Sequence, residues 1–300
     1  MNPRRRWASA VLLALLAGCQ TAPPPPPQPP VVIVPPAPKP PPKAPVIGLA
    51  LGGGAARGFA HIGVIQVLEE AGIRPDLVIG TSAGSLVAAL YASGKNGVEL
   101  ATLAQSMDSG AITDWSFPGR GLIRGEALAR FVREHTGGKR IEQMRMPLGI
   151  VATDLDSGQG IVFRIGDTGV AVRASSAVPA VFQPVRIGAR EFVDGGLVAP
   201  VPVRYARQMG AQLVIAVDIS EAPDGAATGD AMRMLLQTFA IMGRSINQFE
   251  LADADIVLRP KLVGVSGADF TARTRSIQAG RDAATALLGE LRLRILQDTR

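Results

Sequence analysis

The sequence predicts an α/β fold in which helices cover a mainly parallel β-sheet. Two observations lead to this prediction. Short, wholly apolar runs typical of buried strands recur along residues 46–300, and helical patterns separate them. This region has no internal repeat and no low-complexity gap, so it can form one sizeable core. We therefore predict a single α/β domain over 46–300.

The alternation of strands and helices can be followed in chain order. Each predicted strand is a short apolar run bounded by turn-forming or charged residues. The predicted strands are 46–51, 76–80, 147–153, 160–165, 190–193, 212–217 and 254–258. Helices are predicted where apolar residues recur at helical spacing, or where a longer apolar run follows a strand and a turn. The predicted helices are 59–72, 83–93, 97–107, 124–136, 230–250 and 272–297.

The first 18 residues have the composition of a secretory signal. Arg4, Arg5 and Arg6 precede an apolar run, and small residues follow at Gly18-Cys19. The apolar run has about a dozen residues, whereas a transmembrane helix needs roughly 20. We therefore predict a signal peptide at 1–18.

Cys19 is the only cysteine in the chain, so it cannot form an intramolecular disulfide. The stretch L-A-G-C resembles the lipobox of bacterial lipoproteins, which implies that Cys19 is acylated and becomes the first residue of the mature chain. Cleavage by an ordinary signal peptidase, with Cys19 incidental, is the alternative. Gln20 follows where an aspartate commonly retains such lipoproteins at an inner membrane. The expected location is thus the cell envelope, at the periplasm-facing outer membrane of a Gram-negative bacterium.

Residues 19–45 form a second segment, and it is rich in proline. Such a segment favours extended polyproline II, at about 3 Å per residue. We interpret it as a semi-rigid tether that follows the lipidated cysteine and holds the domain away from a membrane. A proline-rich ligand for another domain is the alternative interpretation.

The formal net charge of +6 includes three arginines of the predicted signal peptide. The remaining lysines and arginines are scattered and are not interleaved with aromatic residues, so the sequence does not indicate nucleic-acid binding. A mildly basic domain favours an anionic membrane surface.

The segment Gly80-Thr81-Ser82-Ala83-Gly84 matches the pattern G-x-S-x-G. It follows a predicted buried strand and begins a predicted helix, the context in which a serine lies on a tight turn with its hydroxyl exposed. Gly80 and Gly84 suit such a crowded turn, and the helix N-terminus favours developing negative charge. Ser82 is therefore the candidate nucleophile. A glycine-rich turn with an incidental serine is the alternative.

A second glycine-rich segment, G-G-G-A-A-R-G at 52–58, also joins a predicted strand to a predicted helix. Consecutive glycines leave backbone amides accessible to an anion, as an oxyanion hole requires. A phosphate cradle is the rival interpretation, but neither G-x-x-x-x-G-K-[ST] nor a complete G-x-G-x-x-G is present. Arg57, next to Gly58, either supports the loop or attracts an anionic head group.

Ser82 needs a base, and the chain has only two histidines, His61 and His135. His61 lies within an apolar helical run and His135 ends a polar helix, so neither is placed as a catalytic base. Asp194, in F-V-D-G-G-L, directly follows a predicted strand and precedes two glycines that let the backbone turn. Asp194 is therefore the candidate base, although D-G-G alone is often only a turn.

These motifs together resemble the patatin-like phospholipase family. The resemblance covers most of residues 46–220: G-L-A-L-G-G-G-A-A-R-G-F-A-H-I-G-V, then G-T-S-A-G, then A-S-S-A-V-P-A-V-F-Q-P-V, then D-G-G. Their order and spacing make the match specific. It implies a three-layer α/β/α fold. We expect Ser175 and Ser176, in the third motif, to pack or cap near the site.

The resemblance also implies roles for individual residues. Ser82 would be the nucleophile and Asp194 the base of a Ser–Asp dyad that works without a histidine. The amides around Gly53, Gly54 and Ala55 would form the oxyanion hole.

The sequence thus predicts a hydrolase of acyl esters of lipids, tethered to a membrane through its N-terminal lipid. We expect no cofactor and no metal. A non-enzymatic lipid-binding or scaffold lipoprotein of the envelope is the alternative. The sequence indicates neither the lipid class nor a protein partner.

Overall fold

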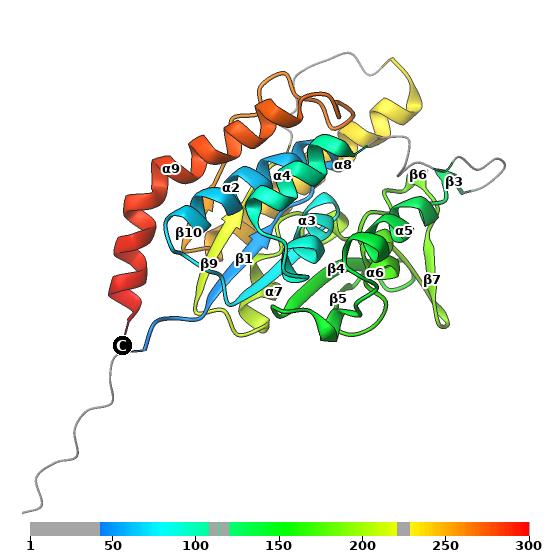
Figure 1. Cartoon of the computed structure of the whole chain (residues 1–300). Coiled ribbons are helices and arrows are strands. Elements are labelled where there is room, and N and C mark those ends of the chain that lie inside the picture. The colour runs from blue at the N-terminus through cyan, green and yellow to red at the C-terminus, as the bar shows by residue number, and fades with distance from the viewer. Residues whose placement is uncertain (1–42, 108–113, 115–119, 221–228, 300) are drawn as a thin grey trace, which may run out of the picture. The chain divides into compact units, whose positions relative to one another are not determined.

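The computed structural model describes residues 43–107, 114, 120–220 and 229–299, which Figure 1 shows in colour. The predicted signal peptide, Cys19 and nearly all of the predicted tether lie outside the described residues. From Pro42 onward the chain forms one compact unit. Every helix and strand of the described residues belongs to that unit.

Among the described residues, the centre of the unit is a sheet of eight strands. The strands are β1 (Ile47–Leu51), β2 (Leu77–Thr81), β4 (Leu148–Asp154), β5 (Gly160–Phe163), β7 (Val185–Ile187), β8 (Arg190–Asp194), β9 (Leu213–Val217) and β10 (Ile256–Leu258). Seven follow the order β10-β9-β1-β2-β4-β8-β7, and β5 pairs with β4 beside that path. The run from β10 to β4 is parallel, whereas β5, β8 and β7 are antiparallel to their neighbours. The predicted mainly parallel sheet is confirmed.

Helices follow most of the parallel strands. They are α2 (Phe59–Glu70), α3 (Ala83–Ala92), α4 (Gly97–Ser106), α5 (Glu126–His135), α6 (Thr168–Ser175), α7 (Val203–Gln208), α8 (Ala231–Glu250) and α9 (Arg273–Asp298). A separate pair of short strands, β3 (Gly121–Ile123) and β6 (Ala180–Phe182), is also parallel. Within the described part of the chain, no helix is both long and apolar enough to cross a bilayer.

Both faces of the sheet are covered. Successive side chains of a strand point to opposite faces, and β1 shows the consequence. Ile47, Leu49 and Leu51 belong to a core cluster that includes residues of α2, α3, α4 and α9, whereas Ala50 belongs to a second cluster that includes residues of α7. Figure 1 shows α2, α4 and α9 stacked over one side of the sheet. The three-layer α/β/α arrangement is therefore confirmed.

Every predicted strand and helix is present to within a few residues. The structure adds α6, α7, β3, β6 and β7, which the sequence did not predict. These five elements are short, and their residues do not form long periodic or apolar runs. Short elements of this kind depend on the contacts that the rest of the fold provides.

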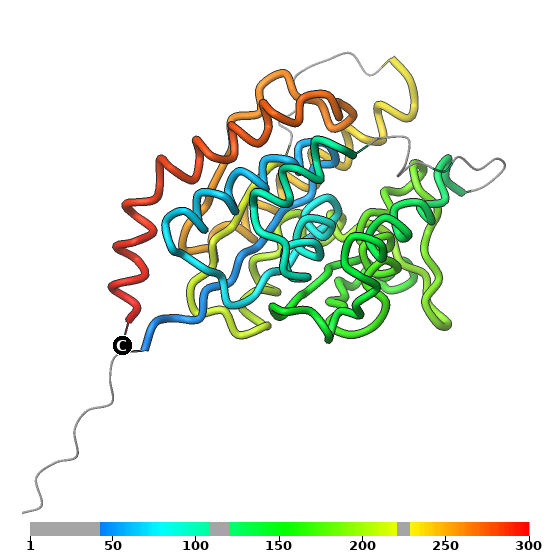
Figure 2. Tube along the Cα trace, viewed as in Figure 1, coloured from blue at the N-terminus to red at the C-terminus, as the bar shows by residue number. Residues whose placement is uncertain are grey.

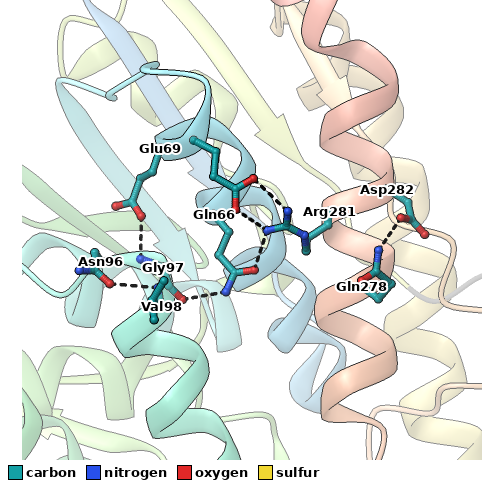
Figure 3. A network of polar contacts seen from close by, with 9 residues as sticks. Gln66, Glu69, Asn96, Gly97, Val98, Gln278, Arg281 and Asp282 are labelled. Carbon is teal, nitrogen blue, oxygen red and sulfur yellow. Dashed lines mark hydrogen bonds and ion pairs between the residues drawn. The ribbon is translucent and has the colours of Figure 1, made fainter.

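Helix α9 lies along α2, as Figures 1 and 2 show, and polar contacts join the two helices in Figure 3. Arg281 donates to the two carboxylate oxygens of Glu70 at 2.8 and 2.9 Å and to Gln66 at 3.1 Å. Gln66 donates to the carbonyl of Gly97 at 3.1 Å, and the amide of Gly97 donates to Glu69 at 2.8 Å. The network therefore connects α9 to α2 and α2 to the start of α4.

Candidate active site

The turns that carry the predicted site residues meet at one edge of the sheet. β1 and β2 are neighbouring parallel strands, so the turns that follow them lie side by side. β2 pairs with β4 through Thr81 and Val151, and the next residue of β4, Ala152, lies opposite Asp194 of β8. Ser82 follows Thr81 directly. It is therefore level with Asp194, with β4 between them.

Ser82 lies between β2 and α3 with φ 53° and ψ −124°. This is a sparsely populated conformation for a residue with a side chain, and it costs on the order of 1–3 kcal/mol. Steric crowding explains why both flanking positions of the motif are glycine. A Cβ on Gly80 would collide with the carbonyl of Gly84, and a Cβ on Gly84 would collide with the carbonyl of Leu51 at the end of β1. The motif thus lets α3 begin close against the sheet, with the serine at the tip of the turn.

Ser175, the last residue of α6, holds the strained turn. Its fully buried hydroxyl accepts a hydrogen bond from the amide of Ser82 at 2.9 Å and donates to the carbonyl of Val151 at 2.6 Å. This single side chain connects the serine turn to the neighbouring strand β4. The motif A-S-S-A-V-P indicated a structural residue here, but its partner is visible only in three dimensions.

Asp194 is the last residue of β8, and its side chain is buried. Oδ1 accepts a hydrogen bond from the amide of Gly196 at 2.7 Å, whereas Oδ2 has no hydrogen-bond partner among the described residues. Burial raises the pKa of Asp194 to about 6, while the nearby Ser82 hydroxyl and the Gly196 amide act in the opposite direction. At neutral pH most of the carboxylate is therefore ionised, with one oxygen available to take a proton.

The glycine-rich loop after β1 presents two free amides. The amide of Gly53 donates to the carbonyl of Pro200 at 2.9 Å, so it is not free for an oxyanion, contrary to its predicted role. The amides of Gly54 and Ala55 make no hydrogen bond to any described residue. Ala55 has φ 48°, a left-handed conformation that turns the chain into a short 3₁₀ helix at Ala55–Gly58. Two of the three predicted donors are thus available.

His61 is fully buried in α2 beneath this loop. Nε2 lies 2.8 Å from the carbonyl of Gly52, and because a carbonyl only accepts, Nε2 carries the proton. Burial lowers the pKa of His61 to about 4. The peptide between Gly52 and Gly53 is therefore held at both ends, by His61 on its carbonyl and by Pro200 on its amide. His61 supports the loop and is not oriented toward Ser82 as a base.

Arg57 and Gly58 complete the support of the loop. The guanidinium of Arg57 donates to the carbonyls of Ile219, Ser220 and Val265 at 2.8, 3.0 and 2.9 Å. These contacts connect the loop to the segments that follow β9 and β10. A Cβ on Gly58 would lie 2.9 Å from the Cβ of Ala83, so the glycine lets the loop approach the start of α3.

Ser82 and Asp194 both line a cavity of about 570 Å³. Gly53, Gly54 and Ala55 contribute to the same cavity, and its other walls are mostly apolar residues from the segment 178–182 and from α8. A cavity of this size fits one small ligand or a single acyl chain. His135 does not line it; that residue ends α5 and lies against Phe131, with ring centres 4.3 Å apart.

This arrangement places a strained serine, a buried carboxylate with a free oxygen and two free amides around one apolar cavity. Residues 49–207 match the family described as patatin-like phospholipase. The chain belongs to this family.

Several relatives share the same region. An uncharacterized NTE family protein of Mycobacterium tuberculosis is 38% identical over 187 residues, which are 61% of this chain and 52% of the relative. A second NTE family protein of that species is 30% identical over 269 residues, or 81% of this chain and 46% of the relative. Patatin-like phospholipase domain-containing protein 6 of Mus musculus is 35% identical over 196 residues, or 62% of this chain and 14% of the relative. The chain thus spans about half the length of the bacterial relatives and far less of the mammalian one.

The fold has a counterpart among solved structures. VipD from Legionella pneumophila superimposes with a TM-score of 0.54 at 17% identity, covering 81% of this chain and 66% of VipD. At this level of identity the likeness concerns the fold alone.

Proposed function

We propose that this protein is a serine acyl hydrolase that cleaves carboxylic ester bonds of lipids through Ser82 and Asp194. One observation carries the proposal. A serine on a strained strand-to-helix turn and a buried carboxylate with an unpartnered oxygen line the same apolar cavity. The membership of the chain in the patatin-like phospholipase family supports the substrate class.

The proposed reaction begins with transfer of the Ser82 proton to Asp194 as the serine Oγ attacks the ester carbonyl carbon. The resulting oxyanion accepts hydrogen bonds from the free amides of Gly54 and Ala55, and the N-terminus of α3 adds favourable potential. Asp194 then gives its proton to the departing alcohol, which leaves an acyl-serine. Asp194 then takes a proton from a water molecule as that water attacks the acyl carbonyl carbon. It returns this proton to the Ser82 Oγ as the bond to the acyl group breaks, which releases the fatty acid and regenerates both residues.

The raised pKa of Asp194 suits this role. A carboxylate with an ordinary pKa is a weak base, and burial strengthens it while leaving it mostly ionised at neutral pH. Ser82 is otherwise unactivated, because His61 is bonded to Gly52 and His135 lies outside the cavity. We therefore assign the base to Asp194 alone.

Labelling with a fluorophosphonate probe tests the proposal, followed by turnover of phospholipids, lysophospholipids and p-nitrophenyl esters. We expect wild type to be labelled and active, Ser82→Ala to be unlabelled and inactive, and Asp194→Asn to lose at least about 10³-fold in turnover. His135→Gln is the matched control and retains activity. A folded wild-type protein that is neither labelled nor active would favour a lipid-binding or scaffold role instead.

We also propose that acylated Cys19 and the proline-rich segment hold the domain at the periplasmic face of a Gram-negative outer membrane. The lipobox-like L-A-G-C supports this, and two or more acyl chains are sufficient for stable anchoring. Fractionation of cells that express wild type or Cys19→Ala tests it. Wild type should incorporate labelled palmitate and sediment with membranes. Identical processing of both proteins would show that Cys19 is incidental.

A further inference from the structure

The residues that α8 buries are polar. Asn247 and Glu250 are its buried residues. Asn247 accepts a hydrogen bond from the amide of Val201 at 3.1 Å, and Glu250 pairs with Arg204 at 2.9 Å. These contacts fix which side of α8 faces the domain.

The opposite side of α8 exposes large apolar residues. Met234, Ile241, Met242 and Phe249 are 57%, 51%, 49% and 78% exposed. Of the eleven large apolar side chains exposed among the described residues, five belong to α8. A surface helix ordinarily directs its polar residues outward. In α8 two polar residues are buried and Leu236 and Phe239 line the cavity, while a second set of large apolar residues faces outward.

Six exposed residues of α8 form one continuous stripe. Positions 234, 238, 241, 242, 245 and 249 follow helical spacing along one side. The two remaining members, Thr238 and Ser245, are exposed and uncharged. We call these six residues the outer stripe. It extends about 22 Å at 1.5 Å per residue and contains no charge.

Two arginines lie along one margin of the outer stripe, between the stripe and the buried side of α8. At 100° per residue, Arg233 and Arg244 project within about 20° of each other. Among the described residues, the one ion pair of Arg233 is with the N-cap residue Asp230, at 3.5 Å, and Arg244 makes none. Arg244 also lines the cavity, together with Leu236 and Phe239 of the same helix. The helix that carries the outer stripe therefore also forms a wall of the cavity that contains Ser82.

We propose that the outer stripe of α8 docks onto the surface of an anionic lipid bilayer, an inference that rests on the proposed function. Apolar side chains of this kind insert at the boundary between head groups and acyl chains, and flanking arginines contact lipid phosphates. Because the opposite side of α8 forms a wall of the cavity, docking of the outer stripe would place the cavity one helix diameter, roughly 10 Å, from the bilayer surface. In Figure 1 the first part of α8, in yellow, extends beyond the neighbouring helices.

Vesicle sedimentation tests the docking directly. All proteins are full chains that carry Cys19→Ala and Ser82→Ala, so neither an acyl chain nor turnover contributes. The test variant replaces the four apolar residues of the outer stripe with glutamine: Met234→Gln, Ile241→Gln, Met242→Gln and Phe249→Gln. The matched control removes four exposed apolar residues elsewhere: Ile165→Gln, Val263→Gln, Leu293→Gln and Leu296→Gln. Circular dichroism and melting verify the fold of each.

On vesicles of phosphatidylcholine mixed with phosphatidylglycerol, we expect the control to bind like its parent and the test variant to bind more than tenfold more weakly. Equal binding by the two variants would overturn the proposal. Arg244→Gln provides a second measurement that does not alter the stripe. It should weaken binding to the anionic vesicles about fivefold, at roughly 1 kcal/mol per arginine near a charged surface, and leave binding to pure phosphatidylcholine unchanged.

Activity separates this proposal from the proposed function. With Ser82 restored, the test variant should lose at least tenfold more activity on vesicles than on a soluble short-chain ester. A wild-type protein inactive on every ester would contradict the proposed function, and sedimentation would still decide the docking. If the stripe instead joins two copies of the chain, velocity sedimentation would show a dimer that the test variant disrupts, with no vesicle binding by either protein.

Discussion

Two glycine-rich turns follow neighbouring strands in this protein, and their glycines serve different purposes. In the turn after β2, Gly80 and Gly84 leave room for backbone: a Cβ on either would collide with a carbonyl or amide of a packed neighbour. In the turn after β1, a Cβ on Gly53 would lie 3.1 Å from the Cβ of Ser82 and no closer to any backbone atom than 3.5 Å. The first turn positions the nucleophile by close packing at both glycines. The second packs closely at Gly52, where a Cβ would lie 2.9 Å from the carbonyl of Val217, but leaves the amides of Gly54 and Ala55 without a hydrogen bond to any described residue.

The largest effect that we expect is on the free energy of unfolding, when the close packing of the serine turn is disturbed. Gly84→Ala places a Cβ against the carbonyl of Leu51, and neither backbone segment has room to move because Gly84, at the start of α3, and Leu51, at the end of β1, are both buried. We expect the free energy of unfolding to fall by about 3 kcal/mol or more, measured by urea denaturation.

Gly289→Ala is the control for that experiment. Gly289 lies within α9 with open space where its Cβ would be, so alanine should stabilise the protein by about 0.5–1 kcal/mol through helix propensity. A Gly84→Ala protein as stable as wild type would show that close packing does not determine the serine turn.

The next effect concerns Asp194, which lines the same cavity as residues of both turns. Its pKa of about 6 in the folded protein exceeds the ordinary value of 3.8 for an aspartate. The folded state therefore binds its proton more tightly than the unfolded state, and its contribution to stability falls as the pH rises from about 4 to about 6. Asp194→Asn removes the cost of burying the ionised carboxylate. At pH 7 it should therefore stabilise the protein by roughly 2–3 kcal/mol while abolishing turnover.

The measurement is the difference in unfolding free energy between Asp194→Asn and wild type across pH 4–7. This difference should grow through the interval, and wild-type turnover should rise with pH around 6 as the base ionises. A difference that is flat with pH would show that burial does not perturb this carboxylate.

Most of the fold was predictable because it follows from local patterns. The runs that became β1, β2 and β9 are short and wholly apolar, and the pattern around Ser82 identifies its turn without any tertiary information. Ser82 and Asp194 were also found from their positions at strand ends. The structure brings them to the same cavity.

The remaining features depend on contacts between distant segments. The carbonyl of Pro200 accepts a hydrogen bond from the amide of Gly53, and no local signal in the glycine run indicates this partner. The hydroxyl of Ser175 accepts a hydrogen bond from the amide of Ser82. Ser175 is the last residue of a short helix, α6, that the sequence does not predict. The periodicity of α8 predicts a helix, but only the burial of residues such as Asn247 shows which of its apolar residues face outward.

A smaller effect is expected in the loop after β1. Gly53→Ala adds a methyl group 3.1 Å from the Cβ of Ser82 and 3.9 Å from its Oγ, where the substrate carbonyl must approach. We expect kcat/KM to fall at least tenfold while the free energy of unfolding changes by less than about 1 kcal/mol. Fluorophosphonate labelling rates and thermal melting measure the two quantities. If stability falls as far as in Gly84→Ala, the two turns do not differ in the way described above.

The smallest effect concerns Ala55, where the same loop has a side chain in a left-handed conformation, φ 48°. That conformation costs an alanine about 1–2 kcal/mol, whereas glycine adopts it freely but adds about 0.4–1 kcal/mol of entropy to the unfolded chain. Because Ala55 is exposed, its methyl group contributes little packing, and Ala55→Gly should stabilise the protein by up to about 1 kcal/mol. Ala56→Gly, at the adjacent buried residue with an ordinary φ, should destabilise it by about 1 kcal/mol. Thermal melting of the two variants should therefore show shifts of opposite sign, and a loss of stability in both would mean that Ala55 is not strained.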